Sequence, residues 1–255
     1  MEPVRITKDI YQFTFINEKS DFPINITALI DGVRVILIDT GYKRFAGQVK
    51  KYFLQKGISN FVIFLSHHHE DHFDGCKSFD GSKTYASSHF RDDFQQHLQS
   101  DEYLKNFQPD EYILDGGSFS TDNFEIEYIY TPGHNKCEFS FLINEKYFYA
   151  GDLIFYNKYG LPSIPYLDGN STVKEYLNSL KIINVINPEY ILLGHGHYLF
   201  EKTDMIRQIE NRIFYLEKIQ AAACEIPVQD CLKGDTADYC GLNFHTGNLK
   251  SAAKT

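Results

Sequence analysis

The stretch Phe61-Val-Ile-Phe-Leu-Ser-His67-His68-His69-Glu70-Asp71-His72 decides the fold that we expect for this chain of 255 residues. Its apolar beginning predicts a buried strand, and four histidines and two acids fill the six positions 67–72. A buried strand has no structural reason to end in so many polar groups, because burying them costs free energy. We therefore interpret the end of this strand as a functional site.

The spacing within this stretch is suited to metal binding. His67 and His69 are two residues apart, so on an extended backbone their imidazoles point to the same side and can hold one ion. Asp71 and His72 follow at once, and after a turn they can face a second ion. Two adjacent ions stabilise both the attacking and the leaving oxygen in hydrolysis. The alternative interpretation of these residues is a solvated polar loop.

Composition restricts the class of protein. Hydrophobic residues make up 43% of the chain and charged residues 23%, as in ordinary globular proteins. The net charge is −9 and the chain has no basic cluster, so nucleic acid is an unlikely substrate and we expect a small molecule. No run approaches the roughly 20 apolar residues of a membrane span. The N-terminus shows no signal-peptide pattern.

The cysteines support an expected location in the cytoplasm. They are odd in number and scattered, which argues against a disulfide framework and favours a reducing compartment. We expect Cys76 and Cys137, which lie near the candidate ligands in sequence, to be small buried thiols. The five cysteines are Cys76, Cys137, Cys224, Cys231 and Cys240.

Periodicity predicts the remaining elements. Asp31-Gly32 between two apolar runs indicates a hairpin, and a strand–helix–strand order over residues 33–65 indicates a parallel crossover. Strands are expected at 10–16, 24–30, 33–38, 61–65, 83–86, 111–115, 124–131, 138–143, 147–150 and 190–193. Helices are expected at 45–54, 88–98, 171–185 and 203–223, with a further short one at 248–254.

Three later strands also end in residue types that bind metals. In Thr131-Pro132-Gly133-His134 the proline and glycine break the strand and direct His134 out of its end, where it can reach the ion of His67 and His69. Gly151-Asp152 ends another strand, and Gly194-His195-Gly196-His197 ends the last. Each short element is a weak signal alone, but their recurrence at strand ends indicates one shared rim.

The pattern His-x-His-x-Asp-His after a hydrophobic strand, with the later Thr-Pro-Gly-His, Gly-Asp and Gly-His elements, resembles the metallo-β-lactamase superfamily of hydrolases. The resemblance extends over roughly residues 10–200, and Asp39-Thr40-Gly41 matches the superfamily's early Asp-x-Gly turn. It implies an α/β (α+β) fold, a four-layer αββα sandwich over residues 1–200. Residues 201–255 are then expected to form a C-terminal helical extension packed on the same domain.

The resemblance also implies a ligand set for two ions, with His134 on the first ion, His195 on the second and Asp152 bridging both. Asp39 is expected to support the ligand loops. Two zinc ions are the expected cofactors, and iron or manganese are the alternatives. The expected ligands are His67, His69 and His134 for one ion, Asp71, His72 and His195 for the other, and Asp152 for both.

The implied reaction is direct hydrolysis by a hydroxide held between the ions, because coordination lowers the pKa of water to about 7. Asp71, which can relay a proton, and Asp152 are the expected catalytic carboxylates. The aromatic segment 153–170 is a candidate substrate wall. Tyr156, Tyr159 and Tyr166 are candidate hydrogen-bond donors to an oxyanion, with packing as the alternative role. Substrate contacts are expected from Tyr156 and Tyr166, and His197 is expected either behind the ligands or beside the substrate.

Departures within the superfamily narrow the substrate. His72 and Asp152 take the second-ion roles for which the best-known zinc β-lactamases use a cysteine, which disfavours antibiotic hydrolysis. His69 argues against the redox-active diiron relatives, which have glutamate there. The pattern resembles the hydroxyacylglutathione hydrolase and lactonase branch, although the short tail weakens the case for glutathione. We predict a small ester, thioester or lactone.

Two further functions stay open at this stage: phosphodiester hydrolysis, and metal binding on the same scaffold without turnover. The apolar stripe of the helix at 203–223 is expected to pack on the domain, and a homodimer contact is the alternative.

Overall fold

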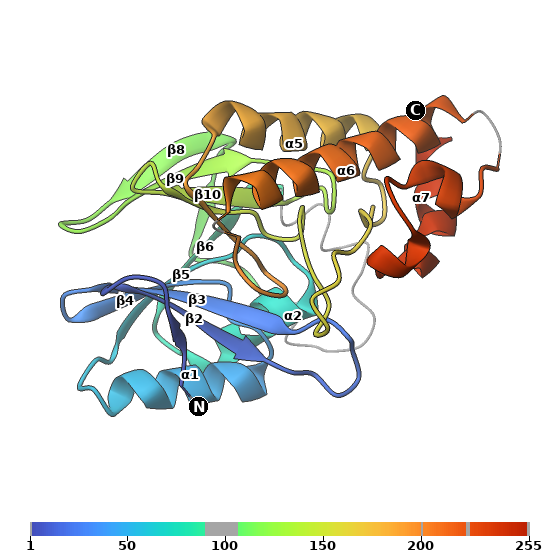
Figure 1. Ribbon diagram of the computed structural model, residues 1–255. Helices are drawn as coiled ribbons and strands as arrows, with labels where there is room; N and C mark the ends of the chain where they lie inside the picture. The colour runs from blue at the N-terminus through green and yellow to red at the C-terminus, as the bar shows by residue number, and fades with distance from the viewer. Residues whose placement is uncertain (1, 90–106, 200, 223–224, 254–255) are drawn as a thin grey trace.

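The structure is a computed structural model that describes residues 2–89, 107–199, 201–222 and 225–253. Its strands form two sheets that face each other, and helices cover the outer side of each sheet (Figure 1). The first sheet has the order β1-β2-β3-β4-β5-β6-β7, and the second has the order β12-β11-β10-β9-β8. Helix, sheet, sheet and helix therefore follow one another, which confirms the predicted αββα sandwich.

The strands and helices have the following bounds. The first sheet contains β1 (Val4–Arg5), β2 (Ile10–Phe15), β3 (Ile24–Asp31), β4 (Arg34–Ile38), β5 (Asn60–Phe64), β6 (Lys83–Ser87) and β7 (Glu111–Ile113). The second contains β8 (Gly116–Ser120), β9 (Glu125–Tyr130), β10 (Phe139–Ile143), β11 (Tyr147–Tyr149) and β12 (Tyr190–Leu192). The helices are α1 (Lys43–Leu54), α2 (Glu70–Phe73), α5 (Val173–Ile186), α6 (Lys202–Ala221) and α7 (His245–Ala252).

Most predicted elements are present, and the sequence missed two strands. β1 is too short to show periodicity, and β8 begins Gly-Gly-Ser, a composition that is depleted in strands. The final helix begins at His245 rather than at 248. The helix predicted for 88–98 falls largely on residues 90–106, outside the described residues.

Chain connectivity brings the ends of distant strands to one edge. α1 connects β4 to the parallel strand β5, so both strands end at the same edge of the first sheet. In the second sheet β11 is antiparallel to β10 and parallel to β12, while β9 is antiparallel to β10. The ends of β9, β11 and β12 therefore share one edge.

Three apolar cores separate the four layers. Alternation divides the side chains of β5: Phe61 and Ile63 pack in the core beneath α1, whereas Val62 and Phe64 pack between the sheets. β10 and β11 complete the central core, and α5 and α6 bury their apolar faces together against the outer side of the second sheet. The continuous apolar runs in the sequence arise because these strands are covered on both faces.

Helix α5 has clear sequence signals at both ends. The Thr172 hydroxyl accepts the Glu175 N–H, and the Glu175 carboxylate accepts the Thr172 N–H, which together form a capping box. Asn187 ends the helix in a left-handed conformation with φ 53°. In the described part of the chain, no helix combines the length and apolarity needed to cross a bilayer.

The central core offers a direct test of the sandwich. Phe64 is fully buried, and its ring centroid lies 4.7 Å from that of Tyr85, 5.2 Å from Phe119 and 5.8 Å from Phe141. Phe64→Ala should lower the free energy of unfolding by about 3–5 kcal/mol, because it leaves a cavity between the sheets. Urea denaturation measures this change.

The matched control is Val185→Ala on α5, where the side chain is 85% exposed. It should change the free energy of unfolding by less than about 0.5 kcal/mol. A Phe64→Ala loss as small as that of the control would contradict the packing between the sheets.

Candidate metal centre

Seven side chains meet at the shared edge of the two sheets. His67 and His69 follow β5, Asp71 and His72 lie in α2, and His134, Asp152 and His195 follow β9, β11 and β12. Each residue offers one ligand atom, and the atoms within a group lie within 4.8 Å of one another. The first group is His67, His69, His134 and Asp152, and the second is Asp71, His72 and His195.

Ring nitrogens lie close together in both groups. In the first, His69 Nδ1 is 3.0 Å from His67 Nε2 and 3.1 Å from His134 Nε2. In the second, the Nε2 atoms of His72 and His195 are 3.4 Å apart. Asp71 Oδ2 is 3.6 Å from His195 Nε2.

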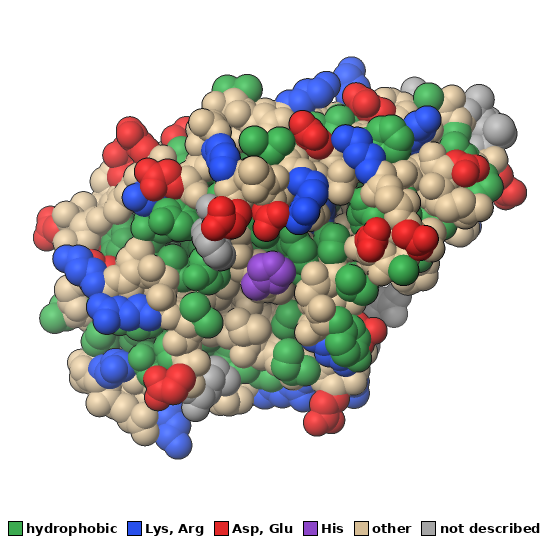
Figure 2. All heavy atoms as spheres, viewed as in Figure 1, with side chains coloured by type: hydrophobic (Ala, Val, Ile, Leu, Met, Phe, Trp, Pro, Cys, Tyr) green, Lys and Arg blue, Asp and Glu red, His purple; other side chains and the backbone are tan. Residues whose placement is uncertain are grey.

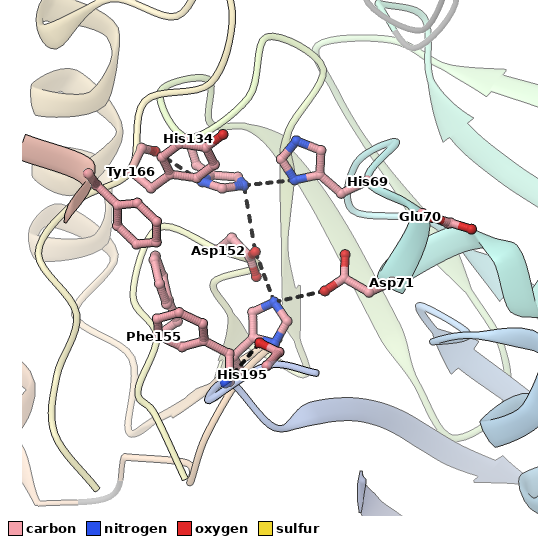
Figure 3. A pocket seen from close by; sticks show the side chains of 11 residues that line it. His69, Glu70, Asp71, His134, Asp152, Phe155, Tyr166 and His195 are labelled. Carbon is pink, nitrogen blue, oxygen red and sulfur yellow. Dashed lines mark hydrogen bonds and ion pairs between the residues drawn. The ribbon is translucent and has the colours of Figure 1, made fainter. Parts of the chain in front are cut away.

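The Asp152 carboxylate lies between the two groups (Figure 3). Its Oδ2 is 3.6 Å from His134 Nε2 and 4.0 Å from His67 Nε2 on one side. It is 3.1 Å from His195 Nε2 and 3.5 Å from His72 Nε2 on the other. Its Oδ1 is buried and has no hydrogen-bond partner in the described structure. One carboxylate therefore faces nitrogens of both groups.

Hydrogen bonds on the far side of three rings fix where the protons are. His134 Nδ1 lies 3.0 Å from the Tyr166 carbonyl and His195 Nδ1 lies 2.7 Å from the Pro23 carbonyl. Carbonyl oxygens only accept, so both Nδ1 atoms carry the proton. The Ser66 hydroxyl donates to Asp39, so it accepts from His67 Nδ1 at 3.0 Å. All three rings direct Nε2 at the centre.

The other two imidazoles contact carboxylates in the same way. His72 Nδ1 lies 2.7 Å from Asp39 Oδ2, and His69 Nε2 lies 2.9 Å from Asp168 Oδ2. When these rings are neutral, lone pairs and carboxylates converge at the centre and repel one another. A bound cation removes that repulsion, and outer hydrogen bonds of this kind orient metal-binding histidines. The donor set of imidazole and carboxylate therefore fits zinc.

The buried charges set the protonation of the centre. Burial lowers the pKa of His134 to about 4 and that of His67 well below its usual value, so both rings are neutral at pH 7. Burial also acts to lower the pKa of His72, but the carboxylates of Asp152 and Asp39 outweigh it and raise this pKa well above its usual value. A metal ion must therefore displace a proton from His72.

Asp39 holds the ligand segments together. It is fully buried, and its carboxylate accepts hydrogen bonds from the Ser66 N–H, the Ser66 hydroxyl, His72 Nδ1 and the Tyr149 hydroxyl at 2.6–2.8 Å. Its backbone is left-handed with φ 59°, a conformation that Asp tolerates better than most residues. These bonds give Asp39 the supporting position that the resemblance implies.

The glycine before His134 allows a close approach to α5. Gly133 has φ 153°, and a Cβ atom there would lie 2.5 Å from the Cα of Tyr176. Only glycine lets this segment pack so closely on the helix, and the packing directs His134 back to the site.

A pocket of about 360 Å³ opens over both groups. The sequence did not predict Phe22 or Phe244 here, since neither lies in a motif, and Phe155 was predicted only as part of the wall at 153–170. Asp168 was also missed, because its contact with His69 depends on how the segment 153–170 folds. The pocket is lined by Ser20, Phe22, His69, Glu70, Asp71, His134, Asp152, Phe155, Tyr166, His195 and Phe244.

The predicted substrate contacts differ in position. Tyr166 lines the pocket, but Tyr156 and His197 line a separate depression, where their ring centroids are 4.5 Å apart. Tyr156 pairs with Pro162 in an isolated antiparallel bridge, and its neighbour Phe155 takes the position over the site. Tyr159 is 70% exposed. Neither Tyr156 nor His197 therefore reaches the candidate centre.

Comparison with known proteins gives the following matches. A family model described as the metallo-beta-lactamase superfamily matches residues 20–195. The chain is 28% identical over 193 residues to the Drosophila melanogaster protein named beta-lactamase-like protein 2 homolog, covering 73% of this chain and 63% of the relative. It is 26% identical to the Caenorhabditis elegans homolog over 199 residues, covering 74% and 61%. The chain thus spans under two thirds of the length of these relatives.

Solved structures share the fold. A metallo-beta-lactamase family protein from Thermus thermophilus matches with a TM-score of 0.68 and 16% identity, covering 97% of this chain and 93% of that one. The DIM-1 metallo-beta-lactamase matches with a TM-score of 0.67 and 14% identity, covering 85% and 97%. At such identities the likeness concerns the fold.

The protonation of the centre predicts how metal affinity depends on pH. Because the pKa of His72 is raised, its ring holds a proton through neutral pH, and zinc must compete with that proton. The zinc affinity of the metal-free protein should rise with pH by about tenfold per unit for each proton displaced, until the pH passes the raised pKa. Competition with a chelator at several pH values measures the slope.

The control His89→Gln removes an imidazole that binds Asp115, outside both groups. It should leave the slope unchanged. An affinity that is the same across about pH 6 to 8 would contradict the proton on His72.

Proposed function

The chain belongs to the metallo-β-lactamase superfamily, and from this premise we propose that it is a hydrolase that uses two zinc ions to cleave a small ester, thioester or lactone. The observation that carries the proposal is the position of Asp152 Oδ2, between His134 and His195 and facing both ligand groups. A carboxylate so placed suits a bridge between two ions, with His67, His69 and His134 on one side and Asp71, His72 and His195 on the other.

Bound zinc ions would supply an activated water at neutral pH and polarise the substrate carbonyl. The residues of the chain orient the ligands and transfer the protons. The histidines must enter the reaction neutral, and their outer hydrogen bonds hold the correct tautomer. Asp71 lies half-buried at the edge of the pocket, where its carboxylate can take the proton of the attacking water. Water adds to the carbonyl carbon, the bond to the alkoxide or thiolate breaks, and the proton taken from the water passes to this leaving group.

The charge distribution supports a small uncharged substrate over a nucleic acid. On the face shown in Figure 2, Lys and Arg side chains are interspersed with Asp and Glu side chains. The pocket itself is lined by Glu70, Asp71 and Asp152. No Lys or Arg is among the described residues that line the pocket, so a polyanion would find no cationic side chains there for its several phosphate contacts.

Removal of the bridging carboxylate tests the proposal. Asp152→Ala should lower kcat/KM by more than about 100-fold, because the two ligand groups lose their shared ligand. The bound zinc should fall from about two equivalents to one or fewer. Hydrolysis of a thioester, a lactone and bis(p-nitrophenyl) phosphate, with metal analysis of each sample, measures both effects.

The matched control is Asp122→Ala, which removes an exposed carboxylate in the turn before β9. It should keep full activity and metal content. Zinc binding without turnover of any substrate in the wild type would point to a metal-binding protein, and a preference for the phosphate diester would point to a phosphodiesterase.

A further inference from the structure

We propose that the C-terminal extension completes the substrate pocket with an aromatic wall, and that this pocket selects esters, thioesters or lactones whose acyl group is uncharged and apolar. The proposal rests on the proposed hydrolase function. The substrate class is inferred from the residues that surround the metal centre, whereas the metal ligands determine the type of reaction.

The aromatic wall consists of Phe22, Phe155, Tyr166 and Phe244, which all line the pocket. The Phe244 ring centroid lies 4.7 Å from that of Tyr166 and 6.4 Å from that of Phe155. Phe22 lies 5.2 Å from Phe155 and 6.2 Å from Phe244. The four rings therefore form one continuous apolar surface, assembled from segments far apart in the sequence.

The wall stands beside both ligand groups. Tyr166 lies 5.3 Å from the His134 ring, and Phe155 lies 6.1 Å from the His195 ring, between centroids (Figure 3). A carbonyl held at the metal centre would place its acyl substituent against these rings. Burial of apolar surface there contributes binding free energy in proportion to its area.

The extension holds Phe244 firmly in this position. Asn248 of α7 donates from Nδ2 to the Pro165 carbonyl at 2.6 Å and accepts the Leu167 N–H at 3.1 Å. Cys240 adds two backbone hydrogen bonds to the same segment. The segment that carries Tyr166 is thus tied to the segment that carries Phe244, so the wall is formed before substrate binds.

A glycine lets the chain turn back at the start of this wall. Gly241 has φ 69°, and a Cβ atom there would lie 2.7 Å from the Phe244 ring and would clash with the Ser163 hydroxyl. A left-handed residue without a side chain is needed for Phe244 to fold over the pocket.

The aromatic wall offers no cationic side chain to an anionic acyl group. Of the carboxylates that line the pocket, Asp71 and Asp152 are proposed zinc ligands, which leaves Glu70, and no Lys or Arg is among the described lining residues. Arg212 lies behind the wall, buried, and donates to the carbonyls of Phe155 and Ser163. A carboxylate or phosphate at the far end of the acyl chain would be buried against the aromatic rings without a cationic side chain, which is costly.

The volume of about 360 Å³ suits a short acyl chain together with part of the leaving group. It lies at the small end of the roughly 300–1,000 Å³ that ligand pockets span. We therefore test acyl chains of moderate length that differ only in charge.

The first experiment compares p-nitrophenyl hexanoate with the p-nitrophenyl monoester of adipic acid on the zinc-loaded full chain. The two esters share the leaving group and the number of acyl carbons, and the second carries a terminal carboxylate. We expect kcat/KM to favour the hexanoate by about 100-fold. Equal rates, or a preference for the adipate, would overturn the proposal.

The second experiment assigns the selectivity to the wall. Phe244→Ala should lower the ratio of kcat/KM for hexanoate to that for acetate by about tenfold, because the longer chain loses more contact. Phe244→Leu should lower this ratio less, and this variant still tests the proposal if the alanine variant misfolds. The control is Phe214→Ala, which removes another half-buried phenylalanine of the extension that does not line the pocket. An unchanged ratio in both Phe244 variants would overturn the proposal.

A binding measurement separates this proposal from the proposed function. Hexananilide and adipic acid monoanilide are amide counterparts of the two esters, and calorimetry gives their Kd without turnover. If hexananilide binds more tightly than adipic acid monoanilide, and Phe244→Ala weakens its binding, the aromatic wall is supported. If no ester is cleaved in that case, only the proposed hydrolase function fails. Ester hydrolysis together with equal or tighter binding of the charged anilide would overturn the wall alone.

Discussion

Mutual repulsion between buried lone pairs is the constraint on which this structure depends. The metal-facing nitrogen of His69 lies 3.0 Å from that of His67 and 3.1 Å from that of His134, and carboxylates converge on the same centre. In the described structure their outer nitrogens contact a hydroxyl, a carboxylate and a carbonyl. A protein of ordinary stability, about 5–15 kcal/mol, can hold such a cluster only if the scaffold is rigid or a cation is bound.

The sandwich supplies that rigidity. Strand ends from both sheets meet at one edge, so short loops after β4, β5, β9, β11 and β12 reach a common point. Asp39 links these loops across the two sheets, because it accepts from Ser66 and His72 on one side and from Tyr149 of β11 on the other. The central core beneath this edge fixes the position of the two sheets relative to each other. Stability and site geometry therefore depend on the same packing.

The sequence predicted the parts of the molecule that repeat a local pattern. Apolar runs identified the strands that form the two buried sheets. The motifs at the ends of these strands identified the residues that meet at the centre. Phe22, Phe244 and Asp168 could not be found this way, because their positions depend on loops and on a C-terminal segment that packs across a long sequence separation. Tyr156 was chosen as a tyrosine of the segment 153–170, and His197 because it follows the ligand His195, but both line another depression. Division of the chain at residue 200 stays a prediction.

The central claim is that Asp152 bridges two ions, and anomalous diffraction from zinc-saturated crystals tests it most directly. The account predicts two anomalous peaks at the zinc edge on opposite sides of Asp152 Oδ2. One should lie among His67, His69 and His134, and the other among Asp71, His72 and His195. A single peak bound to one group, or peaks that do not contact Asp152, would contradict the account.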